Sequence, residues 1–362
     1  MYLHNFAMRR ISGELVENKI IIKKVKDIGR FYSKSHFGIT ITNNILALDL
    51  IEGVFLLDEG KLRLFQDGVE IFLQDIVKLS AKQTHHFEIK YLIFRDLRKR
   101  GYQIKIDEES KDFDFILNKT EDGSRKNKKK YFITSFSERD IMDITKIKQL
   151  IKTAINNNGD LWFAIVDEEG DITYYEISIL DIRGMNSEYK FLKTTGILLE
   201  NRVVIFDKNI AGKLLDKEFY GKPFGNGLQL SMVEALYLME KGVFEIQDIA
   251  KEKIFTLRDF KNLIRKIQSD IDMRFTVFSD LKKRGLIVKT GFKFGAHFRA
   301  YTKKPDKTHA EFLIHVVKYN FKSMWAEISR AVRLAHSVNK EIIFARLGKS
   351  EIDYIKLGRL RP

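Results

Sequence analysis

Short apolar runs and longer helical patterns alternate along the chain. The segments KIIIKKV (19–25) and RVVIF (202–206) are rich in β-branched residues and predict short strands. The segment LQLSMVEALYLMEKG (228–242) repeats apolar residues at helical spacing and ends at Gly242, a residue type favoured just after a helix. The mostly apolar run from Phe312 to Val317 predicts a buried strand. The chain therefore mixes helices with strands.

The same order of segments occurs twice. Residues 13–61 align with residues 196–243, and FRDLRKRGY (94–102) aligns with FSDLKKRGL (278–286). The aligned landmarks are Gly13 with Gly196, Asn18 with Asn201, Tyr32 with Tyr220, Glu52 with Glu234, and Gly60 with Gly242. The chain is thus a tandem duplication with a period of about 183 residues, which is too long for a solenoid of small repeats.

Each copy predicts two structural units. The first unit has strands, a turn-rich segment and an apolar helix, which is an α+β order. The second alternates strands with helices, which indicates a mixed α/β sheet with flanking helices. Residues 259–285 predict a basic amphipathic helix between these parts of the second copy. The expected unit boundaries are 1–83, 84–185, 186–262 and 263–362.

Composition narrows the class of protein. Apolar residues make up 44% of the 362 residues, which suits a globular protein, and no run of 18 uncharged apolar residues predicts a membrane span. The first residues lack the pattern of a signal peptide, and the chain has no cysteine, so we expect a protein of the reducing cytoplasm. The net charge of +15 favours polyanionic partners such as nucleic acid.

The duplication allows one copy to be compared with the other. Three reactive residues of the C-terminal copy have no counterpart in the N-terminal copy. The aligned pairs are Tyr301 with about Ile116, His309 with about Lys128, and Lys340 with Gly159. A requirement of the scaffold should have acted on both copies. The difference therefore indicates chemistry in the C-terminal copy and a supporting role for the other.

Four motifs in the C-terminal copy resemble a known family. They are YGKPFG…LQLSMVEALYLMEKG (220–242), DLKKRGLIVKTGFKFGAHFRAY (280–301), HAEFLIHVV (309–317) and AVRLAHSVNKEIIFA (331–345). In this order they are similar to the archaeal tRNA-splicing endonucleases in which two fused repeats form one chain. The resemblance implies nuclease-like second units, with only the one at 263–362 catalytic, and a homodimer. It also implies catalytic roles for Tyr301, His309 and Lys340.

The resemblance further implies the substrate and the products. The substrate is precursor tRNA cut at bulge-helix-bulge sites, and the products carry a 2′,3′-cyclic phosphate and a 5′-hydroxyl. Metal-free cleavage of RNA needs a base for the 2′-hydroxyl, an acid for the departing 5′-oxygen and a cation near the phosphate. His309 suits the acid because its ordinary pKa is near 6.5, and Lys340 suits the cation. Tyr301 either acts as the base or positions the 2′-hydroxyl.

Further residues are expected to bind RNA or a second chain. Arg333 lies on a helix expected at 325–338, and extending that helix to Lys340 would put both residues on one face. By resemblance, Arg333 and Arg359 would hold a flipped-out base between them. The segment DEEGD (167–171) is acidic, whereas its counterpart GKSE (348–351) is not. By resemblance it would dock into a cationic groove of a partner chain through Asp167, Glu168, Glu169 and Asp171.

Plainer interpretations stay open for these residues. Tyr301 could be a solvated residue at a strand edge, His309 a loop residue, and Lys340 a cation that complements a helix C-terminus. His315, inside the apolar run, is interpreted as a core histidine, and the basic segment 123–130 as a solvated loop that could also contact phosphates.

Two other functions compete with the endonuclease. One is a non-catalytic protein that binds structured RNA. The other is a metal-dependent nuclease, for which DFDF (112–115) offers carboxylates only in the copy interpreted as inactive. His85 and His86 have no thiolates or suitable carboxylates nearby in sequence, so we expect no structural zinc, no other metal and no cofactor.

Overall fold

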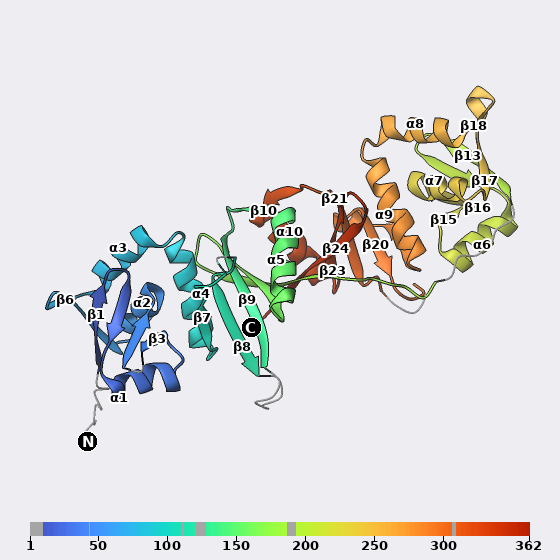
Figure 1. Cartoon of the computed structure of the whole chain (residues 1–362). Helices are drawn as coiled ribbons and strands as arrows, with labels where there is room; N and C mark the ends of the chain where they lie inside the picture. Colours follow the sequence, from blue (N-terminus) through green and yellow to red (C-terminus); the bar gives the residue numbers. More distant parts are fainter. Residues whose placement is uncertain (1–9, 43, 111, 121–127, 187–192, 306–308) are drawn as a thin grey trace, which may run out of the picture.

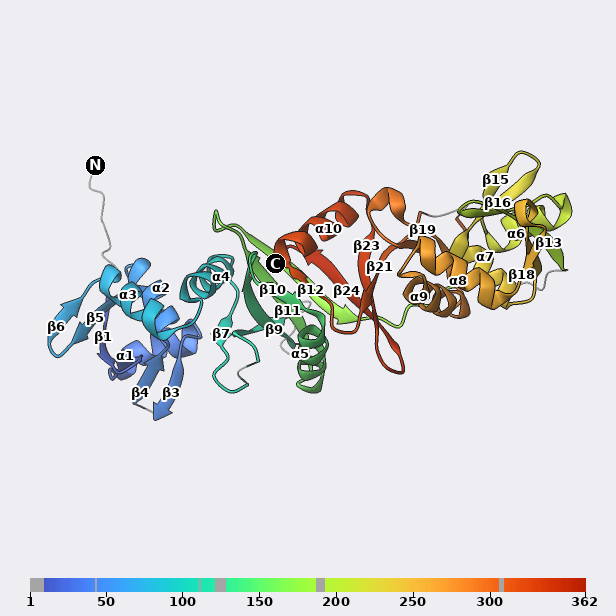
Figure 2. The same cartoon turned by 90° about the horizontal axis from the view of Figure 1, so that it is seen from above.

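The computed structural model describes residues 10–42, 44–110, 112–120, 128–186, 193–305 and 309–362. Most of the basic segment 123–130 and part of the expected junction between the copies lie outside these residues. The molecule is elongated, with one small unit at each end and a large sheet between them (Figures 1 and 2). No helix in the described ranges is long and apolar enough to cross a membrane.

The two end units share one architecture. In the first, a six-stranded sheet has the order β3-β4-β2-β1-β5-β6, and β1 runs parallel to β5. Its elements are β1 (Ile11–Val16), β2 (Lys19–Ile22), α1 (Val25–Ile28), a π-helix (Gly29–Lys34), β3 (Ile39–Thr42), β4 (Ile45–Leu48), α2 (Leu50–Asp58), β5 (Leu62–Gln66), β6 (Val69–Ile71) and α3 (Leu73–Gln83).

The second end unit repeats this pattern in the order β15-β16-β14-β13-β17-β18, with β13 parallel to β17. Its elements are β13 (Thr194–Leu199), β14 (Arg202–Ile205), α6 (Lys208–Glu218), β15 (Lys222–Phe224), β16 (Gly227–Ser231), α7 (Met232–Glu240), β17 (Phe244–Asp248), a 3₁₀ turn (Ile249–Lys251), β18 (Lys253–Phe255) and α8 (Leu257–Ile267). Helix α7 ends just before Gly242, which has a φ of +70°, as the sequence predicts.

One pair of residues shared by the two copies, Glu52 and Glu234, has the same structural role in both. Glu234 forms a capping box with Ser231 at the start of α7, and its other carboxylate oxygen accepts a hydrogen bond from Gly221 N at 3.0 Å. Glu52 makes the same contacts with Asp49 and with Gly38 N, the latter at 2.9 Å. Burial raises the pKa of Glu52 to about 7. In both copies the carboxylate fixes a tight turn against the first helical turn.

The second units of the two copies form one ten-stranded sheet with the order β19-β20-β21-β23-β24-β12-β11-β9-β8-β7. The strands of the first copy are β7 (Ile104–Ile106), β8 (Phe115–Thr120), β9 (Lys128–Ser137), β11 (Gly159–Val166) and β12 (Ile172–Ile179). Those of the second are β19 (Ile287–Thr290), β20 (Phe298–Tyr301), β21 (Phe312–Lys318), β23 (Glu341–Leu347) and β24 (Ile352–Leu360). The flanking helices are α4 (Phe87–Lys99), α5 (Ile144–Asn156), α9 (Ile271–Lys283) and α10 (Trp325–Ser337).

The two halves of this sheet are related by an internal pseudo-twofold axis. Ile177 of β12 and Leu357 of β24 occupy equivalent positions in the two copies, and they pair with each other across the antiparallel junction. A second junction, between β10 (Ile141–Asp143) and β22 (Lys322–Met324), is also antiparallel. The duplication therefore builds a symmetric pair of units within one chain. The mixed, duplicated α+β fold expected from the sequence is confirmed.

Side chains also bind the two copies together. Trp325 of α10 is fully buried and its ring lies 5.5 Å from that of Phe163 on β11. Asp353, only 5% exposed, accepts from Lys148 of the first copy at 2.7 Å and from Arg346 at 2.8 Å. Lys148 also pairs with Glu351 at 3.1 Å. The hairpin that contains Glu351 is thereby tied to its own chain.

The single helix predicted over 259–285 is wrong, because two helices, α8 and α9, occupy this segment. Between them the backbone of Gln268 is extended, with φ of −139° and ψ of 94°. Both helices pack on α7 of the end unit. Helix α8 also packs on β18, whereas α9 also packs on β19, β21 and β23 of the central sheet. The chain turns between the two helices, and the amphipathic pattern does not reveal that turn.

Candidate active site

Three adjacent strands of the second copy bring the candidate residues to one end of the sheet. Strand β20 is antiparallel to β21, and β21 is parallel to β23. Tyr301 ends β20, His309 lies three residues before β21, and Lys340 directly precedes β23. The register partners at this edge are Ala300, Phe312 and Glu341. The sequence alone could not place these segments side by side.

The alternation of side chains along the strands places the candidate residues Tyr301 and Lys340 on the same face of the sheet. Ala300 and its register partners point to one face of the sheet, so their neighbours Tyr301, Glu311 and Lys340 point to the other. The Glu311 carboxylate accepts hydrogen bonds from Thr302 N at 2.8 Å and Thr302 Oγ1 at 2.7 Å. Glu311 thus ties the end of β20 to the segment that leads from His309 into β21.

Tyr301 is buried rather than solvated. It is 7% exposed and packs with Phe219, Ile287 and Ala310. The Arg299 guanidinium lies 5.9 Å from the centre of its ring. The interpretation of Tyr301 as a tyrosine at a solvated strand edge is therefore wrong, since the aromatic ring is held on several sides.

Lys340 and His309 differ in exposure. Lys340 is half-buried, its Nζ donates to Val338 O at 3.1 Å, and it lies 5.4 Å from the centre of the Phe294 ring. His309 is exposed. The arrangement therefore has a positioned cation and an accessible imidazole at the same end of the sheet as the phenol.

Lys340 is not on the face of α10, as an extension of that helix would require. The helix ends at Ser337, and Asn339 has a φ of +54° in the left-handed region. The chain reverses there, and Lys340 N donates to Ala335 O at 3.0 Å. Lys340 reaches the site through this turn, so the predicted helical spacing with Arg333 is wrong.

The alignment of Tyr301 with Ile116 is also wrong. Ala300 pairs with Phe312 in the second copy, and Leu117 pairs with Tyr131 at the equivalent place in the first. The counterpart of Tyr301 is therefore Asn118. The connecting segments 107–114 and 291–297 differ in length, and no landmark in them fixes the alignment. Asn118 has no phenol, so the contrast between the copies is unchanged.

Arg333 and Arg359 lie on different elements but act on the same side chain. Arg333 is exposed on α10, and Arg359 is exposed on β24, where it pairs with Tyr175 of β12. Burial raises the pKa of Tyr175, and the charges of Arg333 and Arg359 both oppose this rise. The charges of both arginines therefore act on one side chain at the junction of the copies.

The acidic segment 167–171 forms the turn between β11 and β12. Asp167 Oδ1 accepts from Glu169 N at 3.1 Å and from Asp171 N at 2.9 Å, and Gly170 takes a φ of +84°. All four carboxylate residues are exposed, although Glu168 forms an ion pair with Arg139. Asp167 thus shapes the turn, whereas Glu169 and Asp171 present charge at its surface.

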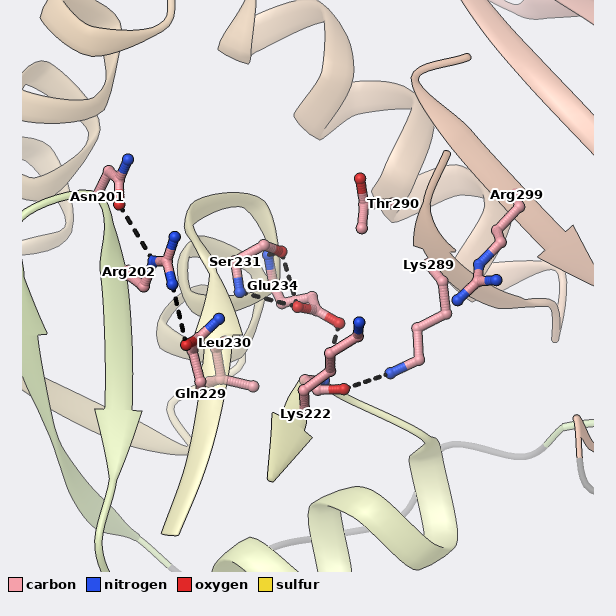
Figure 3. A pocket seen from close by; sticks show the side chains of 11 residues that line it. Asn201, Arg202, Lys222, Gln229, Leu230, Ser231, Glu234, Lys289, Thr290 and Arg299 are labelled. Carbon is pink, nitrogen blue, oxygen red and sulfur yellow. Dashed lines mark hydrogen bonds between the residues drawn. The ribbon is translucent and has the colours of Figure 1, made fainter. Parts of the chain in front are cut away.

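Sequence reasoning missed a basic cavity in the second copy. It has a volume of about 240 Å³ and lies between the end unit and the β19–β20 hairpin. Lys222, Lys289 and Arg299 extend toward the same space (Figure 3), and Arg202 and the buried Glu234 complete the charged lining. The Nε of Arg299 is buried without a hydrogen-bond partner among the described residues.

The first copy repeats only part of this charge. Ile39 stands where the second copy has Lys222, and Ile116 stands where it has Arg299. Lys105 and Lys19 are the counterparts of Lys289 and Arg202, and Lys19 pairs with Asp49 and Glu108 at 3.5 and 2.5 Å. Once the register was known, comparison of the copies would have found Lys222 and Arg299.

One of the two carboxylates considered for a metal-dependent nuclease, that of Asp114, has structural partners. Asp114 accepts from Ser135 N at 2.7 Å and pairs with Lys90 at 2.8 Å. Within the described ranges, no group of three or more His, Asp or Glu residues could hold a metal ion. Asp114 therefore helps to hold β9 and α4 together at this end of the sheet.

His315, predicted as a core histidine, is partly buried in β21, and it should make stability depend on pH. Its ring stacks on Phe344 at 5.5 Å, and burial, with a smaller contribution from His297, lowers its pKa to about 4. Below pH 6.5 the unfolded chain binds the proton and the folded chain does not, so stability present at neutral pH is lost as the pH falls toward 4. This loss amounts to roughly 3 kcal/mol at most.

Urea unfolding at pH 7 and pH 4.5 measures this dependence. The His315→Phe variant should lose markedly less stability on acidification than the wild type. The matched control is His85→Gln, which changes an exposed histidine. An equal loss in His315→Phe and in the wild type would contradict the assignment.

Two descriptions of protein domains match this chain. The description "tRNA intron endonuclease, catalytic C-terminal domain" matches residues 87–174 and 271–354. The description "tRNA intron endonuclease, N-terminal domain" matches residues 11–77 and 194–261. Both matches occur once in each copy.

Named relatives are similar over almost the whole chain. A tRNA-splicing endonuclease of Methanococcoides burtonii is 34% identical over 355 residues, which cover 96% of this chain and 99% of the relative. The protein of the same name from Methanosarcina barkeri is 31% identical over 96% of this chain and 99% of its own. That of Methanosarcina mazei is 31% identical over 98% of this chain and 100% of its own.

Proposed function

The chain belongs to the tRNA intron endonuclease family, and we propose that it excises introns from precursor tRNA by cutting the RNA at bulge-helix-bulge sites without a metal ion. The activity that goes with this membership is that of a tRNA-splicing endonuclease. One observation supports the proposed metal-free cleavage. Tyr301, the segment that contains His309, and Lys340 lie at the same end of three adjacent strands. These three residue types occur together at this place in only one of the two copies.

The proposed reaction uses the substrate's own 2′-hydroxyl. Its oxygen forms a bond to the adjacent phosphorus as the bond from phosphorus to the 5′-oxygen breaks. His309, in its protonated form, gives a proton to the departing 5′-oxygen, and Lys340 stabilises the negative charge on the phosphate oxygens. Tyr301 accepts the proton of the 2′-hydroxyl or holds that hydroxyl in line. The products are a 2′,3′-cyclic phosphate and a 5′-hydroxyl.

Arg333 and Arg359 supply a proposed site for a flipped-out base. Both side chains are exposed to solvent near the junction of the copies, and both charges oppose the rise in the pKa of Tyr175. Unpaired bases in RNA are accessible to planar cations, whereas paired bases are not. Recognition would then depend on the shape of the RNA, in particular on its bulges, rather than on its sequence.

We also propose that two chains form a homodimer through the acidic turn. Asp167, Glu168, Glu169 and Asp171 of one chain would face Arg202, Lys222, Lys289 and Arg299 of the other. The acidic turn belongs to the first copy, and the cavity lined by these four cations belongs to the second. Each chain would therefore give one turn and receive one, which closes a twofold dimer.

Residues 1–83 would form the first end unit and 84–185 the supporting nuclease-like unit. The expected boundary between 262 and 263 falls inside α8 (Leu257–Ile267), which packs on α7 and β18. We therefore propose that the second end unit extends from 186 to 267 and that the catalytic unit follows it. The location proposed for the enzyme is the cytoplasm, because a chain without cysteine suits a reducing compartment.

The test is incubation of the purified protein with an intron-containing precursor tRNA in excess EDTA. We expect cleavage at both intron borders at an unchanged rate, with fragment ends that carry a cyclic phosphate and a 5′-hydroxyl. Cleavage that stops in EDTA and returns with added Mg²⁺ would favour a metal-dependent nuclease instead. Binding without any cleavage, with or without metal, would favour the RNA-binding alternative.

A further inference from the structure

One aromatic side chain of the catalytic unit is almost fully exposed. Phe292 is 87% exposed, in the short 3₁₀ turn Phe292–Phe294 that joins β19 to β20. A solvent-facing phenylalanine forgoes the stabilisation that burial would give a side chain of this size. The neighbouring Lys293 is also exposed. An exposed ring beside a flexible cation is the combination found where proteins bind unpaired nucleotides.

The turn is anchored on both sides, so it holds Phe292 in a fixed place. Gly295 has a φ of +66°, and a Cβ at Gly291 would come within 2.8 Å of the Phe298 backbone. Phe294, in the same turn, packs against the core between the sheet and α10. The anchoring leaves Phe292 pointing outward from an ordered base.

The same turn lies beside the proposed active site. The centre of the Phe294 ring is 5.4 Å from Lys340 Nζ. A Cβ at Gly295 would lie 3.9 Å from Leu334 on the last part of α10. Phe292 also lines a cavity of about 480 Å³ between the catalytic unit and the end unit, together with Arg274 and His297. A nucleotide next to the cut phosphate could therefore reach the ring.

The first copy has an acidic segment in place of this turn. The two segments can be compared because the strands that follow them align. Phe298, the first residue of β20, and Phe115, the first residue of β8, occupy equivalent register positions. Between the strands the second copy reads GFKFGAH (291–297), without a carboxylate, whereas the first reads DEESKDFD (107–114). There Glu108 pairs with Lys19 of its own end unit. A polyanion would be repelled by the first segment and attracted by the second.

We propose that Phe292 stacks on an unpaired base of the substrate RNA, with Lys293 facing an adjacent phosphate. This inference rests on the proposed function, since it names a second contact to the same RNA beside the arginine pair. Stacking tolerates any base because every base has a π-face, so Phe292 would add affinity without adding sequence preference. Removing the ring should weaken RNA binding by about 5- to 100-fold.

The experiment measures binding to an RNA with two bulges in which the 2′-hydroxyls at the cut sites are replaced by hydrogen. We expect Phe292→Ala to raise the Kd for this RNA by about 5- to 100-fold. Phe292→Trp, which keeps an aromatic ring, should bind with the Kd of the wild type. Phe72→Ala, which removes an exposed ring of the first end unit, is the matched control and should not change Kd. With 2-aminopurine at successive bulge positions, the wild type should quench one position that Phe292→Ala does not.

The outcomes separate this inference from the proposed function. An unchanged Kd in Phe292→Ala, while the wild type cuts unmodified precursor tRNA, overturns the stacking and leaves the function intact. Binding that depends on Phe292, without cleavage of the unmodified RNA, supports the stacking and rejects the function. If Phe292→Ala instead sediments as a monomer under conditions in which the wild type is a dimer, the ring belongs to an interface between chains, and the stacking is rejected.

Discussion

Replacing His309 by alanine is expected to lower the rate of RNA cleavage by about 10²- to 10⁴-fold, because the departing 5′-oxygen would lose its proton donor. Binding of the RNA should change little, since His309 is exposed and contributes little to the core. Single-turnover cleavage of precursor tRNA, with the binding constant measured separately, tests both parts.

A matched control for His309→Ala is His336→Ala, which removes another exposed histidine of the same unit, at the end of α10. This variant should keep cleavage within a few-fold of the wild type. Tyr301→Phe is the companion variant, since it keeps the buried ring and removes only the hydroxyl. A His309→Ala enzyme that cuts at the wild-type rate would show that the three residues do not share one reaction.

Reversing the charge of the acidic turn is expected to separate the proposed dimer. The variant is Glu168→Lys with Glu169→Lys and Asp171→Lys, and it keeps Asp167 because that side chain accepts two backbone hydrogen bonds of the turn. Placing three lysines against a cationic cavity should weaken dimerisation by about 10³-fold, since like charges at an interface cost several kcal/mol. Sedimentation velocity over a range of concentrations measures this change, and cleavage should fall with it.

A second reversal should restore what the first removes. Arg202→Glu, Lys222→Glu and Arg299→Glu change the cavity and leave Lys289, whose Nζ donates to Gly221 O at 2.8 Å. A chain that carries both sets of changes would regain complementary charges at both contacts of a twofold dimer. Recovery of the dimer in this chain, with each single set monomeric, identifies the two surfaces as partners. Dimers of wild-type affinity in the acidic-turn variant would disprove the docking.

The local sequence predicted much of the secondary structure, and its failures have clear causes. The apolar pattern located β21 and α10, and Gly242 marked the end of α7. It did not show the break between α8 and α9, because an amphipathic pattern records which side is buried but not which surface it is buried against. It also extended α10 toward Lys340, because a single left-handed residue, Asn339, leaves no mark on the hydrophobic period.

The sequence proposed the candidate residues but did not show their surroundings. Tyr301, His309 and Lys340 were found because a duplicated chain carries its own comparison, and a residue present in only one copy is visible in the sequence. The cavity lined by Lys222 and Arg299 was not found, since these residues belong to different units and approach each other only in the folded chain.

By itself, the sequence determined the duplication, the order of strands and helices, and which copy carries the reactive side chains, since periodicity and residue identity are local properties. Only the tertiary structure decided that β12 and β24 join the copies into one sheet, that Asn118 is the counterpart of Tyr301, and that four cations line one cavity. Pairing register and the approach of distant segments depend on packing between surfaces, and no single stretch of the chain encodes that packing.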